Sequence, residues 1–494
     1  MKHAGSLLLI ALMSASCTTT PGGTAEPDAP RARNVILFVG DGMGIATVTA
    51  ARILDGQRRG GQGEDNWLSF ERFPQSAFSR TYSVDFQVAE SAGTMTAMMS
   101  GIKTQSAKIG TDASGPVGSC EGLARSTVPT LLELAEDRGL ATGVVTTTRI
   151  THATPAATYA HVPDRNWEVD RSIPPAEAAL GCRDIARQLV EFDRGDGIDV
   201  VMGGGRAVFL PAAATDPEVP AVKGARADGR DLIAEWQARH ADGSYVWNRA
   251  GFDAIGADAG KVLGLFEPDH MKFEIDRGTD AGGEPSLAEM TAKAIALLSR
   301  NERGYFLMVE GGRIDHGHHA GNAHRALTDT IAFADAVAVA ARDTSADDTL
   351  IVVTADHSHT LTIGGYPARG NPILGLARAP NGELELDGAG RPFTTLSYAN
   401  GPGAHAASDV QPAGPKTFPH QPKSFDAAPV ARADLTEVDT LAPGYLQEAL
   451  VPGPAETHGG EDVPVYARGP GSTSVHGVID QNEIFRIMKD AYGW

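Results

Sequence analysis

The chain has 494 residues, enough for one large α/β domain or for two to three ordinary domains. Its composition, 42% hydrophobic and 21% charged, provides a large core and excludes a chain that is disordered throughout. The net charge of -20 argues against a nucleic-acid-binding protein, which needs a basic face, and suits a soluble protein that binds multivalent cations in local pockets.

The N-terminus has the features of a signal peptide over residues 1–17. Lys2 gives a positive start, and an apolar run of about ten residues and then small residues follow it. The run is too short to span a bilayer, which needs about 20 residues; a buried first helix is the alternative. Residues 18–32 predict a disordered tether.

Cys17 ends this segment in "SASC", which suggests a lipid-modified cysteine. Ser14 stands where such a signal usually has leucine, so the sequence leaves lipid attachment open. We therefore expect an exported protein that is periplasmic, or that is anchored to the cell envelope only through a lipid on Cys17.

Four apolar segments have the composition of buried strands, and helical stretches such as 128–140 and 286–301 lie between them. Apolar strands that alternate with amphipathic helices predict a largely parallel sheet with helices on both faces. In such sheets ligands bind beyond the carboxyl ends of the strands. The four segments are 34–44, 141–161, 304–317 and 349–359.

The stretch "AESAGTMTAMMSG" at 89–101 predicts a helix that begins near Ser91. An oxygen atom at a helix N-terminus lies where anions are favoured, which suits a nucleophile that attacks an anionic substrate. The alternative is that Ser91 only caps the helix. Taken without the rest of the chain, the residues around Ser91 favour the cap.

Two cysteines remain beyond the signal segment, Cys120 and Cys182. An exported chain with an even pair of cysteines is permitted a disulfide. The sequence does not show that the two sulfur atoms meet, and two buried free thiols are the alternative.

The stretch "VEGGRIDHGHHAGN" at 309–322 crowds acidic groups and three histidines at the end of a strand. Charge is costly to bury, so this is either a solvated loop or a segment that cations hold together. Asp315 and His319 are spaced i, i+4 and would lie on one side of a helical turn. Carboxylate and imidazole together suit zinc, although such pairs are common on surfaces. We expect His318 to lie in solvated loop.

Asp356 and His357 follow another strand and form a second candidate metal pair. Adjacent residues of an extended strand point to opposite faces, so both reach one ion only if the chain turns there. His458 in "ETHGGED" completes a set of three, although a lone histidine is more often a surface residue.

Residues 370–442 are rich in Gly, Pro and Asn and have few apolar runs. We expect an irregular insertion or small subdomain at the surface there. The core would then comprise residues 33–369 and 443–494, and it would end in a helix.

Six motifs occur in the order and at the spacings of the alkaline phosphatase family. The match runs from about Arg33 to the C-terminus and resembles the animal branch more closely than the enteric bacterial branch. The resemblance implies a three-layer α/β/α sandwich with a small inserted crown. The motifs are "VGDGMG", "ESAGTMTA", "HATPAATYAHVPDRNW", "VEGGRIDHGHH", "VTADHSHT" and "ETHGGEDV".

The resemblance also implies roles for individual residues. Arg165 matches the arginine that grips phosphate, since a planar guanidinium holds two oxygen atoms at once. His359 matches a histidine that orients Asp315. The implied metal sites are a first zinc site of Asp315, His319 and His458, a second zinc site of Asp41, Ser91, Asp356 and His357, and a magnesium site of Asp41, Thr154 and Glu310.

The implied activity is hydrolysis of phosphate monoesters at alkaline pH through a covalent phosphoserine at Ser91, with a broad substrate range. Two zinc ions and one magnesium ion per subunit would support it. The rivals are a phosphodiesterase or sulfatase on the same metal core, and a surface protein that binds metal or phosphate without catalysis.

The chain departs from the family pattern at Glu90, where the family usually has aspartate before the serine; we expect altered phosphate affinity without loss of activity. His152 and His316 match the animal pattern, whereas the enteric branch has aspartate and lysine there. This predicts looser magnesium binding and faster phosphate release.

Three further expectations come from animal relatives. Cys120 and Cys182 fall where these relatives carry a disulfide. Tyr366 resembles a tyrosine that reaches into the partner of a homodimer, although an ordinary loop aromatic is the alternative. The resemblance also implies a calcium site formed by Glu218, the carbonyl of Phe266, Glu267 and Glu284. The loop before Glu284 is two residues longer here than in the animal relatives, and solvated acidic side chains are the alternative.

Overall fold

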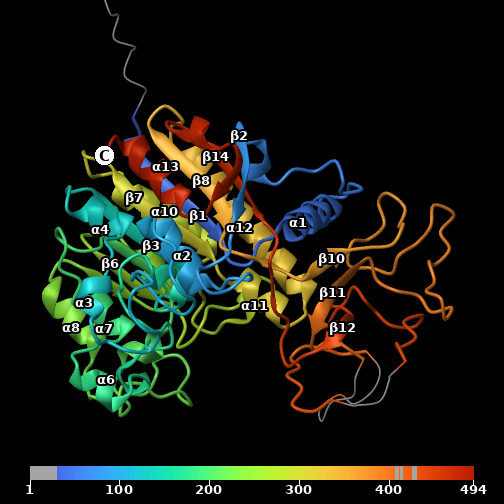
Figure 1. Ribbon diagram of the computed structural model, residues 1–494, viewed down its shortest axis with the longest axis horizontal. Helices are drawn as coiled ribbons and strands as arrows, with labels where there is room; N and C mark the ends of the chain where they lie inside the picture. The colour runs from blue at the N-terminus through green and yellow to red at the C-terminus, as the bar shows by residue number, and fades with distance from the viewer. Residues whose placement is uncertain (1–30, 406–410, 412–414, 426–430) are drawn as a thin grey trace, which may run out of the picture.

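A sheet of ten strands organises the molecule, and helices cover both of its faces (Figure 1). The computed structural model describes residues 31–405, 411, 415–425 and 431–494. The signal peptide, Cys17 and the tether as far as residue 30 lie outside the described residues. None of the described helices is long and apolar enough to span a membrane.

The main sheet is mostly parallel, as predicted. Only one of its strands, Val463–Arg468, runs antiparallel to its two neighbours. The order across the sheet is β15 (Gly477–Asp480), β2 (Gln75–Arg80), β14 (Val463–Arg468), β8 (Thr349–Ala355), β1 (Asn34–Gly40), β7 (Tyr305–Gly311), β3 (Ala141–Arg149), β4 (Val200–Gly204), β6 (Val262–Leu265) and β5 (Ser244–Val246).

The helices form the two outer layers. One layer contains α1 (Ile45–Arg58), α9 (Arg249–Ala254), α10 (Leu287–Leu298), α11 (Arg313–His319) and α12 (Ala323–Asp343). The other contains α2 (Ser91–Ser100), α4 (Leu131–Glu136), α5 (Ala153–Ala156), α7 (Ile185–Val190), α8 (Leu232–Arg239) and α13 (Glu483–Tyr492). The remaining helices are α3 (Leu123–Ser126) and α6 (Pro175–Ala179), with 3₁₀ turns at Ser69–Arg72, Asp170–Ser172, Arg206–Phe209, Arg277–Thr279 and Ser472–Ser474.

The apolar sequence of the central strands follows from this sandwich. In β1, Val35 and Leu37 pack in one core cluster while Ile36 and Phe38 pack in the other. Successive side chains of a strand point to opposite faces, and here both faces are covered by helices. A continuous apolar run is therefore the pattern that such a strand needs.

The register of the central strands places the functional residues at one level. Gly40 at the end of β1 pairs with Gly311 of β7 and with Ala355 of β8. The residues that follow these strands, Asp41 and Asp356 among them, therefore emerge at the same edge of the sheet. This edge is where a parallel sheet binds its ligands.

A smaller sheet lies to one side of the sandwich (Figure 1). Its strands are β10 (Leu361–Ile363), β11 (Leu396–Gly401) and β12 (Ala449–Pro452), in that order. Irregular chain connects them, in keeping with the composition of the region. The division of the chain at residues 370 and 442 stays a prediction. A two-residue ladder of β9 (Ser358–His359) with β13 (His458–Gly459) ties the C-terminal part of the chain to the end of β8.

The disulfide between Cys120 and Cys182 is present, and it resolves the alternatives left open by the sequence. The two residues are separated by 62 positions and pack with Trp167 and Ile173 in a cluster apart from the main core. A cross-link over so long a loop stabilises the fold mainly because it restricts the unfolded chain.

We predict that replacing Cys120 and Cys182 together by serine lowers the free energy of unfolding by roughly 2–5 kcal/mol. The urea midpoint of the purified variant measures this change. Reductant should shift the wild-type protein toward the same midpoint and leave the variant unmoved. Equal urea midpoints for the wild type and the variant in the absence of reductant would contradict the prediction.

Candidate active site with three metal positions

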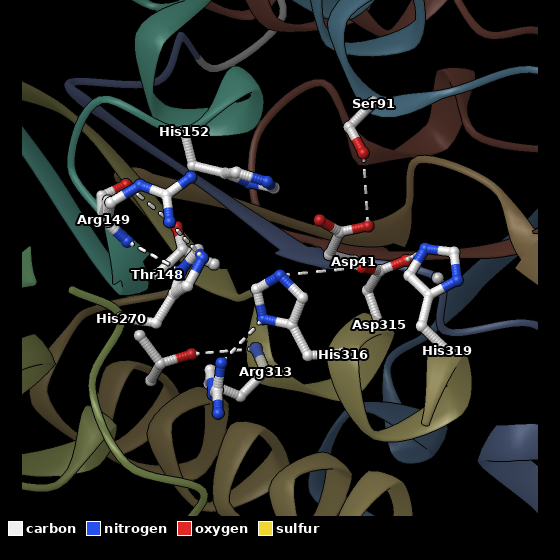
Figure 2. A network of polar contacts seen from close by, with 12 residues as sticks. Asp41, Ser91, Thr148, Arg149, His152, His270, Arg313, Asp315, His316 and His319 are labelled. Carbon is white, nitrogen blue, oxygen red and sulfur yellow. Dashed lines mark hydrogen bonds and ion pairs between the residues drawn. The ribbon is translucent and has the colours of Figure 1, made fainter. Parts of the chain in front are cut away.

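The carboxyl edge of the sheet opens into a pocket of about 360 Å³. Residues from many separate segments of the chain meet there, and Figure 2 shows part of this arrangement around Asp41, Ser91 and Asp315. The pocket is lined by Ser91, Arg149, His152, Arg165, Asn166, Glu168, Asp315, His316, His319 and His458.

Asp315, His319 and His458 converge as the sequence predicted. The Nε2 atom of His319 lies 3.2 Å from Asp315 Oδ1 and 3.2 Å from Nε2 of His458. The Nε2 atom of His458 lies 3.5 Å from the same carboxylate oxygen. Two imidazole nitrogens and a carboxylate oxygen at these separations could hold one zinc ion.

Asp41, Asp356 and His357 form the second group, and all three are fully buried. Nε2 of His357 lies 3.4 Å from Asp41 Oδ1 and 3.3 Å from Asp356 Oδ2. The chain turns directly after β8, so Asp356 and His357 reach the same place despite being adjacent in sequence.

Ser91 begins α2 beside this second group. Its Oγ lies 3.2 Å from Nε2 of His357 and 3.5 Å from Asp41 Oδ1. Glu90, rather than Ser91, caps the helix, since its carboxylate accepts hydrogen bonds from the backbone N–H groups of Ala92 and Gly93, both at 3.0 Å. The hydroxyl of Ser91 is therefore left to the pocket, and the reading of Ser91 as a simple cap is wrong.

Burial and mutual repulsion act on the carboxylates of this edge. Burial, together with the nearby Asp356, Asp315 and Glu310, raises the pKa of Asp41 well above its usual value. Burial likewise raises the pKa of Asp356. Among the described residues, Oδ2 of Asp41 and Oδ2 of Asp356 have no hydrogen-bond partner. Buried anions of this kind fit a bound cation.

The third group lies around Glu310. The ligand atoms of Glu310, Asp41 and His152 are close enough to serve one ion, and Thr154 is fully buried beside them. Burial raises the pKa of Glu310 to about 7, although nearby threonine hydroxyls, that of Thr154 included, lower it. Oε1 of Glu310 has no hydrogen-bond partner in the part of the chain that is described. The oxygen donors suit magnesium.

Arg165 faces the pocket from the segment after α5. Its Nη1 donates to Glu90 Oε2, and its Nη2 donates to Nε2 of His152 at 3.1 Å. Glu90 also accepts from the backbone N–H of Ala107 at 2.7 Å, which fixes the carboxylate in place. Burial raises the pKa of Glu90, but Arg165 and the backbone donors prevail and lower it, so this anchor is charged.

His359 contacts Asp315, as the resemblance implied. Its Nε2 lies 2.8 Å from Asp315 Oδ1, and its Nδ1 lies 2.6 Å from Oε2 of Glu456. Burial lowers the pKa of His359, but the two flanking carboxylates outweigh it and raise this pKa to about 10.

His318 does not lie in solvated loop; that prediction is wrong. Its side chain is fully buried, with Nε2 3.0 Å from the Thr47 hydroxyl and Nδ1 2.8 Å from the Tyr398 hydroxyl. Helix α11 is covered by α12 on one side and faces the pocket on the other. His318 does not line the pocket; its two nitrogens find their partners on α1 and β11.

Arg149 is a pocket residue that the sequence reasoning missed. Its guanidinium binds Glu168 through two hydrogen bonds of 2.8 and 2.6 Å and contacts Asp269. It also contacts His270 (Figure 2). The sequence could have indicated its position, because Arg149 ends β3 at the same edge of the sheet as Asp41.

The candidate calcium carboxylates lie near one another, and Phe266 and Glu267 directly follow β6. Glu267 and Glu284 are buried, and the side chain of Glu218 is only 4% exposed. Asp280, which the sequence reasoning missed, acts on all three carboxylates. Burial, Glu267 and Asp280 raise the pKa of Glu284 to about 9. Asp280 comes from the lengthened loop, so an insertion in the sequence was the available signal.

Comparison with known proteins identifies the family. The family model described as alkaline phosphatase matches residues 32–493. The chain belongs to the alkaline phosphatase family. Tissue-nonspecific alkaline phosphatase of Gallus gallus is 44% identical over 464 residues, covering 92% of this chain and 84% of that one. An alkaline phosphatase of Gadus morhua is 43% identical, covering 93% and 91%.

Solved structures of alkaline phosphatases share the fold. The enzyme of Thermus thermophilus has a TM-score of 0.63 at 24% identity, covering 96% of both chains. A cold-active enzyme of Shewanella sp. has a TM-score of 0.60 at 25% identity, covering 93% of this chain and 100% of that one. A TAB5 alkaline phosphatase mutant, with a TM-score of 0.60, has Mg bound in its M3 site.

Family membership confirms several predictions. The chain is a phosphoric monoester hydrolase of a metal-dependent family that works through a covalent phosphoserine, and the matched relatives include animal enzymes, as the motifs indicated. The exposed Tyr366, 91% accessible, leaves the homodimer a prediction.

We predict that Glu90→Ala weakens binding of inorganic phosphate by roughly 2- to 10-fold, because a released Arg165 must lose rotamer freedom each time it grips the ligand. The inhibition constant of phosphate in a steady-state assay measures the change. Glu71→Ala is the matched control, since Glu71 pairs with Arg52 outside the pocket. Unchanged or tighter phosphate binding by Glu90→Ala would contradict the role of Glu90 as anchor.

Proposed function

We propose that Ser91 is the nucleophile of this phosphomonoesterase and that Arg165 positions the phosphoryl group. The observation that carries the proposal is the placement of the Ser91 hydroxyl, 3% exposed, between His357 and Asp41 at the N-terminus of α2. The guanidinium of Arg165 lines the same pocket. Anions are favoured at a helix N-terminus and beside a held guanidinium.

We infer that two zinc ions and one magnesium ion bind at the three groups. The donor types fit, since imidazole with carboxylate suits zinc and all-oxygen donors suit magnesium. When bound, the cations lower the pKa of the serine hydroxyl and of water and neutralise charge on the leaving oxygen. The residues that would hold them are Asp315, His319 and His458; Asp41, Ser91, Asp356 and His357; and Asp41, Thr154 and Glu310.

The residues of the chain then divide the reaction between them. Ser91 Oγ attacks phosphorus and the bond to the alcohol oxygen breaks on the opposite side, which leaves phosphoserine and the alcohol. Arg165 holds two non-bridging oxygens through both displacements. Water next attacks the phosphoserine, and Ser91 is released together with inorganic phosphate.

A broad substrate range is part of the proposal, and the charge of the pocket lining bears on it. Arg149 and Glu168 both line the pocket, and they neutralise one another through two hydrogen bonds. A wall of this kind does not select strongly for the charge of the leaving group.

A calcium ion is a further part of the proposal. Glu218, Glu267, Glu284 and the carbonyl of Phe266 would bind it, and Asp280 adds a fourth carboxylate. Lys272 lies 2.6 Å from Glu267 and already balances part of the negative charge of the four carboxylates.

Four further features complete the proposal. They are export to the periplasm, a lipid on Cys17, a homodimer and an inserted crown at residues 370–442.

We predict that the purified protein cleaves p-nitrophenyl phosphate far faster than bis-p-nitrophenyl phosphate at alkaline pH. The two substrates share a leaving group, so the ratio of kcat/KM values reports how the site treats non-bridging oxygens. A chelator should abolish turnover, and zinc with magnesium should restore it. Ser91→Ala should bind metals yet neither turn over substrate nor acquire phosphate from it.

Two other results would overturn the proposal. A preference for the diester would mean that Arg165 does not grip a dianionic phosphoryl group and that the enzyme is a phosphodiesterase. No turnover of either substrate by protein with metals bound would favour a binding protein.

We predict that His152→Asp binds magnesium more tightly and releases phosphate more slowly than the wild type. His152 lies within reach of the ion that Asp41 and Glu310 would hold, and a carboxylate there adds negative charge beside the magnesium. Magnesium content after dialysis and the burst kinetics of product release measure the two effects. Wild-type magnesium content and wild-type phosphate release in the variant would show that His152 controls neither property.

A further inference from the structure

Glu456 is a fully engaged buried carboxylate that no part of the proposed mechanism uses. The residue is 1% exposed. Its Oε1 accepts hydrogen bonds from the backbone N–H and from the hydroxyl of Thr360, both at 2.6 Å. Its Oε2 lies 2.6 Å from Nδ1 of His359. A buried carboxylate this well satisfied is held in one orientation.

The side chain of Glu456 reaches the first zinc group through His359. The opposite nitrogen of that ring, Nε2, lies 2.8 Å from Asp315 Oδ1. A carboxylate only accepts, so each nitrogen of His359 donates, one to Glu456 and one to Asp315. The ring therefore cannot turn without breaking two charge-assisted hydrogen bonds.

The backbone of Glu456 reaches the same group by a second route. Its carbonyl accepts from Nδ1 of His319 at 2.6 Å, which leaves Nε2 of that ring for the ion. The N–H of Glu456 donates to the carbonyl of His319 at 2.9 Å. Two residues later the chain supplies His458, which pairs with His359 across the β9–β13 ladder.

We propose that Glu456 is a positioning residue for the first zinc site. It fixes Asp315 through His359, fixes His319 through its carbonyl, and sets the start of the strand that presents His458. The inference rests on the proposed function, because it presumes that Asp315, His319 and His458 bind zinc. Partners behind metal ligands typically control the affinity of a site, and their loss costs roughly 10- to 100-fold in metal binding.

Glu461 offers a matched comparison within the same segment. Its carboxylate accepts from the hydroxyl of Ser358 at 2.6 Å, so it also bonds to β9. Among the described residues it has no hydrogen bond to Asp315, His319 or His458. If any carboxylate beside β9 supports zinc binding, replacing Glu456 or Glu461 should weaken zinc binding equally. If the contacts through His359 and His319 are responsible, only the replacement of Glu456 should weaken it.

The experiment compares zinc binding by the wild type, Glu456→Gln and Glu461→Gln, using competition with a chromogenic chelator. Glutamine keeps the shape of Glu456 but replaces the charged acceptor beside His359 with an amide. We expect Glu456→Gln to release one of two zinc equivalents at a chelator concentration roughly 10- to 100-fold lower than the wild type needs, and Glu461→Gln to match the wild type. Added zinc should restore kcat of Glu456→Gln without a change in KM.

Thr360→Val provides a second variant in case Glu456→Gln folds poorly. It removes one of the two donors to Oε1 and keeps the carboxylate, so we expect the same direction of change with a smaller size. Wild-type affinity for both zinc equivalents in Glu456→Gln or, where that variant does not fold, in Thr360→Val would overturn the inference while leaving the proposed function intact. A wild-type protein that binds no zinc would instead overturn the proposed function.

Discussion

The repulsion among buried carboxylates at one edge of the sheet is the constraint on which the rest of the site depends. Asp41, Asp356 and Glu310 are fully buried and close enough to repel one another electrostatically. Asp315 lies beside them and adds to the repulsion. No folded chain gathers such charges without compensation, since each buried anion costs several kcal/mol. The sandwich supplies the rigidity that forces them together, and bound cations supply the charge that makes this arrangement tolerable.

The protein gives hydrogen-bond partners to only one oxygen of each of two of these carboxylates. Glu310 accepts from Thr146 and Thr148 through Oε2, while Asp356 accepts from the N–H groups of Gly42 and His357 through Oδ1. The opposite oxygen of each is left without a partner in the described structure. The fold thus orients each carboxylate and leaves one of its oxygens without a hydrogen-bond partner, an arrangement that suits the proposed role as a metal ligand.

The sequence predicted the sheet from local rules, whereas the proposed metal ligands came from the family resemblance; the structure brings these residues together at one edge. Apolar strands ending in Asp41 or Asp356 have to meet at one edge once they are parallel, whatever the connections between them. Arg149 obeys the same rule but was missed because its partners, Glu168 and His270, come from segments without a strand signal. His318 and Glu456 could not be placed, since their surroundings depend on which face of α11 or of a two-residue ladder meets the core.

Three arginines also determine the charge of the pocket wall by what they contact. Arg165 donates to His152. Arg149 donates to His270 and Arg313 to His316 (Figure 2). A nitrogen that accepts from a guanidinium carries no proton. Burial lowers the pKa of all three histidines, that of His316 to about 3, so these three rings are neutral. Of the arginines, only Arg149 and Arg165 line the pocket, and each is paired with a glutamate, Glu168 and Glu90. Much of the positive charge that a phosphoryl group requires is therefore left to metal ions, in keeping with a metal-dependent family.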